Sequence, residues 1–175
     1  KKIRDNKAKF PFYSINDIKF RLVRNFFLTK NDYENIMFSM MNEKNFEPKK
    51  FYPILFFNKD DVKNLDKLGH LIGLHSHSHP FRIERFDYKE QKKEYKKNIS
   101  IISKILNKSQ DSIKWMSHPN GSYNNDTLRV LKELGVELGF KQIMTVEPEK
   151  GMKKINNSFL EIASQDHADI YKRMN

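Results

Sequence analysis

Three histidines at alternate positions are the residues of this sequence best suited to chemistry. They are His75, His77 and His79, in the segment GHLIGLHSHSHP that runs from Gly69 to Pro80. Neutral imidazoles bind zinc, cobalt, nickel or iron, and a catalytic site usually combines three protein ligands with an open position for water. In an extended strand all three rings would lie on one face and could meet one cation. If the chain turns instead, His75 and His79 can converge while His77 points elsewhere. A surface histidine cluster, or core histidines bonded to the backbone, is the alternative to a metal site.

The segment also resembles a known motif. It is similar to the second motif of the polysaccharide deacetylases, carbohydrate esterase family four, where a strand delivers His-(Ser/Thr)-x-x-His-Pro and the outer histidines bind the metal. On this resemblance His75 and His79 are the metal ligands and His77 occupies a variable position. MSHPNGSYN resembles the family's third motif, Arg-x-Pro-x-Gly, through Pro119 and Gly121. The two motifs stand in the family's order, and the resemblance extends from about residue 58 to residue 140.

The resemblance implies a fold and an activity. The fold would be α/β, a distorted or incomplete (β/α) barrel, with residues 1–175 forming a single domain truncated at its N-terminus. The activity would be metal-dependent removal of N-acetyl or O-acetyl groups from a sugar polymer or surface-glycan precursor, with zinc, or else cobalt or nickel, as the divalent ion. The partner would be an N-acetylated carbohydrate and not nucleic acid, at the cell surface or in the periplasm. An inactive glycan-binding relative that uses a basic cleft is the alternative.

Two departures from the family pattern bear on activity. The family's first motif is an Asp-Asp pair that supplies a catalytic base and the third metal ligand, and the one such pair here is Asp60-Asp61. It lies fourteen residues before His75 instead of several dozen, and we place it in the first turn of a helix, where the helix dipole favours aspartate. The true pair is then expected upstream of Lys1. Ser117 stands where the third motif has the arginine that orients the base.

Other residues are candidates for the remaining steps of amide hydrolysis. Backbone amides of the turn Pro119-Asn120-Gly121 could bind the oxyanion, and Tyr123 could line the cleft. Near the C-terminus, the resemblance implies that His167 is the general acid, with Asp166 as its partner or as a substrate contact. His118 could also face the cleft.

Helix and strand signals alternate from Asn58 onward. Asn58 is expected to cap a helix that ends at Gly69, and HLIGLHSH is expected to be a buried strand. Asp87 should cap the next helix, IKWMS should be a strand, and a further helix should end at Gly135. The segments VELGF and FLEIA are candidate strands, so the order predicts a mostly parallel sheet with helices outside.

The N-terminal third gives weaker signals. Thr29 and Asp32 have capping-box spacing, and the helix after them carries an apolar stripe that we expect to be core. The stripe consists of Tyr33, Ile36, Met37, Met40 and Met41. The apolar segment FYPILFF contains Pro53, which argues against a central strand and favours an edge strand or a packed loop.

Composition restricts the function classes. The chain has no cysteine, so disulfides and thiolate chemistry are excluded, and its longest apolar runs are far shorter than the ~20 residues of a membrane span. The formal net charge of +11 favours anionic partners. The densest basic cluster, KEQKKEYKKN, mixes lysine with glutamate at helical spacings, which is typical of a solvated helix face.

Overall fold

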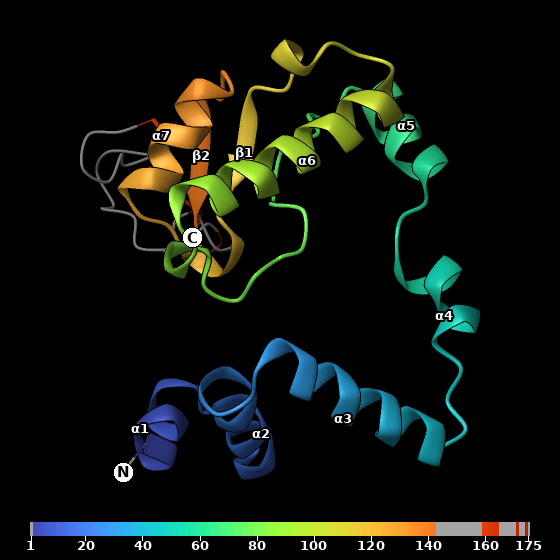
Figure 1. The fold of residues 1–175 in the computed structure, drawn as a ribbon, viewed down its shortest axis with the longest axis vertical. Helices are drawn as coiled ribbons and strands as arrows, with labels where there is room; N and C mark the ends of the chain where they lie inside the picture. The colour runs from blue at the N-terminus through green and yellow to red at the C-terminus, as the bar shows by residue number, and fades with distance from the viewer. Residues whose placement is uncertain (1, 143–158, 165–170, 172–173, 175) are drawn as a thin grey trace. The chain divides into compact units, whose positions relative to one another are not determined.

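The computed structural model describes residues 2–142, 159–164, 171 and 174. The chain forms two compact units, Lys1–Phe56 and Phe57–Asn175, and each is described by itself (Figure 1). No helix in the described ranges is long and apolar enough to cross a membrane.

The first unit is helical. Its helices are α1 (Lys2–Lys9), α2 (Ile15–Phe26), α3 (Lys30–Glu43) and α4 (Pro48–Leu55). The predicted capping box at Thr29 is confirmed, because its hydroxyl accepts the Asp32 amide at 3.1 Å and the Asp32 carboxylate accepts the Thr29 amide at 3.2 Å. Ser14 and Asp17 form an equivalent box at α2. Reciprocal caps of this kind satisfy amides that a helix start leaves unpaired.

Two expectations for this unit are wrong. The segment FYPILFF is neither a strand nor a packed loop, because most of it belongs to α4, with Pro53 inside the helix. Pro48 occupies the start of α4, where its missing N–H would have no helical partner anyway, so it favours the helix. The apolar stripe of α3 is not core either, since Ile36 is 45% and Met40 is 51% exposed. Among the described residues of this unit, the buried hydrophobic side chain is that of Ile18.

The second unit is an α/β structure. Its helices are α5 (Lys59–Lys67), α6 (Tyr88–Leu106) and α7 (Asn125–Glu133), with short 3-10 turns η1 (Ile83–Arg85), η2 (Gln110–Ser112) and η3 (Pro119–Gly121). Its strands are β1 (Trp115–Ser117), β2 (Leu138–Lys141) and β3 (Ile162–Ala163), all parallel in the order β1-β2-β3. Ser117 is in register with Phe140, and Phe140 with Ile162.

The predicted helices and strands of this unit are largely confirmed. Asn58 and Asp87 cap α5 and α6, and the chain leaves α5 and α7 through Gly69 (φ +88°) and Gly135 (φ +73°). Both glycines adopt the left-handed conformation that favours glycine after a helix. The parallel arrangement is confirmed, and of the expected distorted or incomplete (β/α) barrel the described strands form an open three-stranded sheet.

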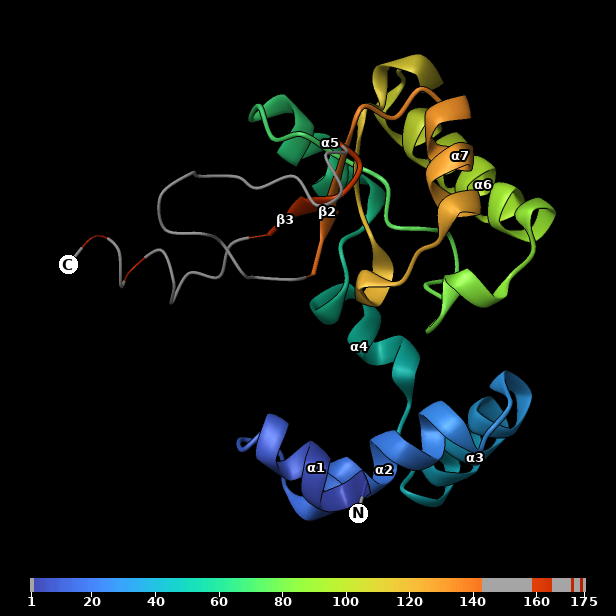
Figure 2. The ribbon, with the colours of Figure 1, turned by 90° about the vertical axis from the view of Figure 1, so that its left-hand side faces the viewer.

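Helices α6 and α7 lie together on one face of the sheet (Figures 1 and 2). A cluster of buried hydrophobic side chains joins α6, α7, β1 and the chain before the histidine loop, and it includes Leu74, Tyr95, Ile99, Met116, Val130 and Leu131. Gly73 passes close to β1, since a Cβ atom built on it would lie 2.8 Å from the carbonyl oxygen of Trp115. The core therefore fixes the chain just before the histidine segment against β1.

The histidine segment is not the buried strand that the sequence predicts. Leu74 makes an isolated parallel bridge with Met116, and the bridge does not extend into a ladder. The reason is conformational: Ser76 adopts φ +62°, which turns the chain out of the extended form. The amide of His75 also bonds to a side chain of α6 instead of a neighbouring strand.

Candidate metal and deacetylase site

The histidine segment forms a tight loop in which His75 and His79 converge. Ser76 and His79 both have positive φ, +62° and +49°, and the Ser76 hydroxyl accepts the His79 amide at 3.2 Å. The rings of His75 and His79 lie 4.9 Å apart between centroids, at an interplanar angle of 54°. All three histidines are exposed. The turned geometry, with two converging rings instead of three in a row, is therefore the one adopted.

Helix α6 holds this loop through two side chains one turn apart. The amide oxygen of Asn98 accepts the His75 N–H at 3.0 Å. The Glu94 carboxylate accepts the amides of His77 (3.1 Å) and Ser78 (2.8 Å), and also the Ser78 hydroxyl (3.1 Å). Hydrogen bonds to an ionised group are stronger than neutral ones, so Glu94 fixes the loop backbone on which the histidines are mounted.

The ring of His75 is oriented by β1. Its Nδ1 atom lies 2.8 Å from the carbonyl oxygen of Ser117, the last residue of that strand. A carbonyl can only accept, so Nδ1 carries a proton, and in the neutral imidazole Nε2 then has a free lone pair. Metal-binding histidines characteristically donate their other N–H to a carbonyl or a carboxylate. His75 is thus in the tautomer in which Nε2 can ligate a cation.

The donor set around these histidines fits a divalent ion only in part. Two imidazoles converge, which suits zinc, cobalt or nickel. However, the described residues contain no group of three or more histidine, cysteine, aspartate or glutamate side chains placed to hold a metal. Asp60 and Asp61 lie in the first turn of α5, as predicted, where Asp61 accepts the Asn58 amide and Asp60 pairs with Lys63 at 3.1 Å.

The turn after β1 has the shape that its sequence indicates. Pro119 is buried, and Asn120 (φ +54°) and Gly121 (φ +65°) both have left-handed backbone conformations. The amides of Gly121 and Ser122 donate to the carbonyls of His118 and Pro119 at 3.0 and 2.9 Å. The Asn120 amide makes no hydrogen bond within the described residues, while its side chain donates to the Phe81 carbonyl at 3.3 Å. Of the amides of Asn120, Gly121 and Ser122, that of Asn120 is therefore the one available to another acceptor.

A buried polar cluster lies directly behind this turn, and sequence reasoning identified only part of it. The ring of His118 stacks on Tyr123 at 4.5 Å between centroids, and its Nε2–H donates to the Leu160 carbonyl at 2.7 Å. Tyr123 donates to the buried carboxylate of Glu161 at 2.7 Å, and the Lys141 ammonium lies 4.6 Å from the Tyr123 ring centre. The cluster fixes Tyr123 at the edge of the turn.

The titration behaviour of the cluster follows from its burial. Burial lowers the pKa of His118, and the nearby Lys141 cation acts in the same direction. The Nδ1 atom of His118 is buried and has no hydrogen-bond partner within the described residues. Burial, together with the hydrogen bond to Glu161, raises the pKa of Tyr123. His118 is therefore a neutral, largely structural imidazole and not an exposed base.

The sequence did not indicate the roles of two pairs of residues, one on α6 and one beside the sheet. One predicted pair also lies outside the residues that the structure describes. The sequence predicts that Glu94 and Asn98 belong to a solvated helix face. Their spacing of four residues does place them on one side of α6. Lys141 ends the short strand β2 and Glu161 directly precedes β3, and neither belongs to a distinguishing motif. Asp166 and His167, the predicted acid and its partner, lie outside the residues that the structure describes.

Solved structures that align with this chain include three deacetylases or esterases. The deacetylase PplD of Streptococcus pyogenes, solved with acetate, aligns with a TM-score of 0.56 at 16% identity over 99% of this chain and 84% of its own. The deacetylase domain of BpsB from Bordetella bronchiseptica aligns at 0.49 and 14% identity over 63% and 48% of the two chains. A family 4 carbohydrate esterase from Streptomyces lividans, also with acetate, aligns at 0.43 and 18% identity over 53% and 44%.

The likeness to the Streptococcus pyogenes deacetylase concerns the fold alone, and family membership rests on a different observation. The chain spans about half or less of the Bordetella and Streptomyces chains. No curated protein matches the sequence. The model of the polysaccharide deacetylase family, in contrast, matches residues 21–139, which is more than half of the chain and includes both the histidine loop and the turn after β1. The chain belongs to the polysaccharide deacetylase family.

Proposed function

We propose that this chain is a metal-dependent hydrolase, or the part of one, that removes acetyl groups from a sugar polymer or a surface-glycan precursor. The observation that carries the proposal is the orientation of His75. Its Nδ1–H donates a hydrogen bond to the Ser117 carbonyl, so Nε2 is the ring nitrogen that can bind a metal beside the ring of His79. This arrangement joins two segments within the family match, at the carboxyl end of a parallel strand. Ligands in α/β folds usually bind at that end.

His75 and His79 would hold the divalent ion, which we take to be zinc, with cobalt or nickel as alternatives. A bound ion of this kind lowers the pKa of water toward ~7 and polarises the acetyl carbonyl. The contribution of the chain is rigidity: Glu94, Asn98 and the Ser117 carbonyl fix the loop and one ring before any ligand arrives. Such supporting contacts usually contribute 10- to 100-fold to metal affinity.

The turn after β1 would bind the oxyanion. The Asn120 amide is free of hydrogen bonds within the described residues, and a preorganised N–H of this kind stabilises charge that develops on the carbonyl oxygen. Pro119 and Gly121 fix the turn that presents it. Tyr123 would contribute its ring to the substrate cleft, because its hydroxyl is already bonded to Glu161. His167 stays a proposal as the acid that protonates the leaving amine, with Asp166 beside it.

A catalytically inactive glycan-binding module is the second candidate. It is favoured by the absence, among the described residues, of an acidic side chain that completes a three-ligand group with the histidines. The serine at position 117, where the family pattern has arginine, points the same way. In this case the chain would bind acetylated glycan without releasing acetate from it.

The deciding experiment measures acetate released by the chain loaded with zinc, cobalt or nickel. Suitable substrates are an N-acetylglucosamine oligomer, acetylated peptidoglycan and an O-acetylated xylan. The His79→Ala variant is the control for contaminating activity. Acetate release that requires His79 supports the hydrolase. Glycan binding without acetate release supports the binding module. If the chain neither binds glycan nor releases acetate, both candidates are contradicted.

A further inference from the structure

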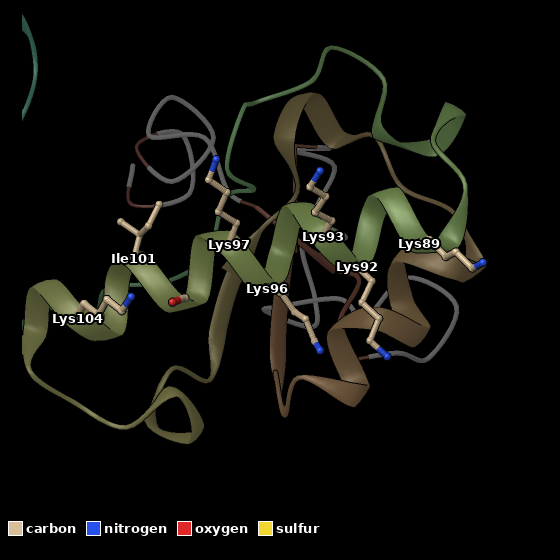
Figure 3. Close-up of a pocket in the computed structure, with 8 residues that line it drawn as sticks. Lys89, Lys92, Lys93, Lys96, Lys97, Ile101 and Lys104 are labelled. Atoms are coloured by element: carbon tan, nitrogen blue, oxygen red, sulfur yellow. The ribbon is translucent and has the colours of Figure 1, made fainter.

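One side of α6 carries a stripe of lysines that have no acidic partner. The lysine stripe consists of five exposed residues: Lys89, Lys93, Lys96, Lys97 and Lys104. Within the described part of the chain, no carboxylate forms an ion pair with any of them. Lys92 is excluded because it pairs with Glu133 at 2.6 Å. The stripe borders an open depression that Ser100 and Ile101 also line, and Figure 3 shows its side chains spreading from the exposed side of the helix.

Among the described residues, the two glutamates of α6 form no ion pair with the stripe and accept hydrogen bonds elsewhere. Glu90 accepts the Asp87 amide in the N-terminal capping box, and Glu94 accepts two amides and a hydroxyl of the histidine loop. At ~1.5 Å per residue the stripe is about 22 Å long. Lys89, Lys93, Lys96 and Lys97 follow one another at steps of about 6 Å or less along the helix axis, within a Debye length of about 8 Å at physiological salt, and Lys104 lies about 10 Å beyond Lys97. The lysines from Lys89 to Lys97 therefore concentrate positive charge on the solvated helix face that the sequence predicts.

The stripe and the support of the histidine loop lie on the same helix. Lys93 and Lys97 directly precede Glu94 and Asn98, the two residues that hold the loop. Each of these two lysines is therefore followed, about 100° around the helix, by a residue that supports the loop. A long anionic chain lying on the stripe would contact the helix that holds the loop of His75 and His79.

We propose that the lysine stripe binds acidic groups of the polymer that the site deacetylates, so the substrate class is an anionic acetylated glycan bearing carboxylates or phosphodiesters. The choice of a glycan rests on the proposed function. The depression contains no aromatic side chain, whereas single-stranded nucleic acid is bound by aromatic stacking as well as charge. Ile101 is its one apolar side chain, whereas helices that lie in membranes carry a broad apolar face.

The test compares two triple variants of the full chain with the same loss of charge. Lys93→Gln/Lys96→Gln/Lys97→Gln removes the centre of the stripe. Lys19→Gln/Lys49→Gln/Lys132→Gln removes three exposed lysines of α2, α4 and α7 that also lack an acidic partner within the described residues. Fluorescence anisotropy would follow binding to a hyaluronan decasaccharide, to poly(glycerol phosphate) decorated with N-acetylglucosamine, and to a neutral N-acetylglucosamine hexamer.

The stripe variant should bind at least one anionic polymer roughly tenfold more weakly at 50 mM salt, and the difference should shrink at 500 mM salt. The control triple should stay within about twofold of the wild type. If binding of hyaluronan depends on the stripe, the recognised group is a carboxylate. If binding of poly(glycerol phosphate) depends on it, the recognised group is a phosphodiester. Equal weakening by both triples would overturn the proposal, as would binding of single-stranded DNA of equal charge with the same affinity and the same dependence on the stripe.

The binding readout separates this proposal from the proposed function. Stripe-dependent binding by a chain that releases no acetate would uphold the stripe as a surface for anionic glycans and contradict hydrolysis by this chain. Acetate release that is the same for anionic and neutral glycans, and is unchanged in the stripe variant, would uphold the hydrolase and refute the stripe.

Discussion

The Nδ1 atom of His75 and the carbonyl oxygen of Ser117 lie 2.8 Å apart, although the two residues are 42 positions apart in the chain. This hydrogen bond physically joins the histidine loop to the end of β1, the two segments that carry the family's motifs. Residue 117 contributes through its backbone, so the contact does not depend on which side chain stands there. Serine can therefore replace the family's arginine without disturbing the orientation of His75.

The first prediction concerns the metal. His75→Ala and His79→Ala should each reduce zinc content from near one equivalent to below about one tenth, because a site that rests on two converging imidazoles retains little affinity when one is lost. Elemental analysis of tag-free protein after zinc loading and dialysis measures this directly. His77→Ala is the matched control, since the amide of His77, and not its ring, holds the loop. Equal zinc loss in all three variants would contradict the assignment.

The second prediction concerns the support of the loop. Glu94→Ala removes the acceptor of three hydrogen bonds and leaves the His77 and Ser78 amides without it. We expect zinc affinity to fall by about 10- to 100-fold and stability to fall by about 1 kcal/mol, because Glu94 is only half-buried and water can replace part of the loss.

Titration with a zinc-buffered indicator and urea unfolding would measure these two quantities. The Glu137→Ala variant is a suitable control, since it also deletes a glutamate but breaks only a surface ion pair with Lys114. If both variants bound zinc as the wild type does, Glu94 would have no part in the site.

The helices that position the site could be predicted because their signals are local. Asn58 and Asp87 accept amides within three residues of themselves, and Gly69 and Gly135 relieve backbone strain at their own positions. The parallel order of the strands likewise follows from the alternation of helices and strands along the chain. These features need no knowledge of distant parts of the fold.

The features that could not be predicted depend on distant contacts. The turn at Ser76 is stabilised by Glu94 and Asn98, which lie about twenty residues later and look like ordinary polar positions of a charged helix. Pro53 argues against a strand but does not say that Pro48 will start a helix around it. The burial of Glu161 depends on its partner Tyr123 from a distant loop, and nothing in FLEIA indicates that contact.

The third prediction tests the assignment of the Asp-Asp pair. Asp60→Asn and Asp61→Asn should leave zinc content and acetate release unchanged, because both residues belong to the first turn of α5. Asp61→Asn should still lower the free energy of unfolding by roughly 0.5–1 kcal/mol, since it weakens the capping box with Asn58 and a favourable interaction with the helix dipole. Urea unfolding and elemental analysis on the same preparations separate the two effects. Loss of zinc in either variant would show that the Asp60-Asp61 pair belongs to the metal site.

The fourth prediction concerns pH. Burial lowers the pKa of His118 in the folded chain, whereas the unfolded chain titrates near ~6.5. Below that pH the unfolded state binds more protons than the folded state, so the free energy of unfolding should fall as pH decreases from about 6.5 toward the lowered pKa, by at most about 1.4 kcal/mol per pH unit. His118→Gln keeps a donor for the Leu160 carbonyl but cannot titrate, and it should flatten this slope. Urea unfolding at several pH values between 5 and 8 would compare the variant with the wild type, and equal slopes for the two proteins would show that His118 is not the group responsible.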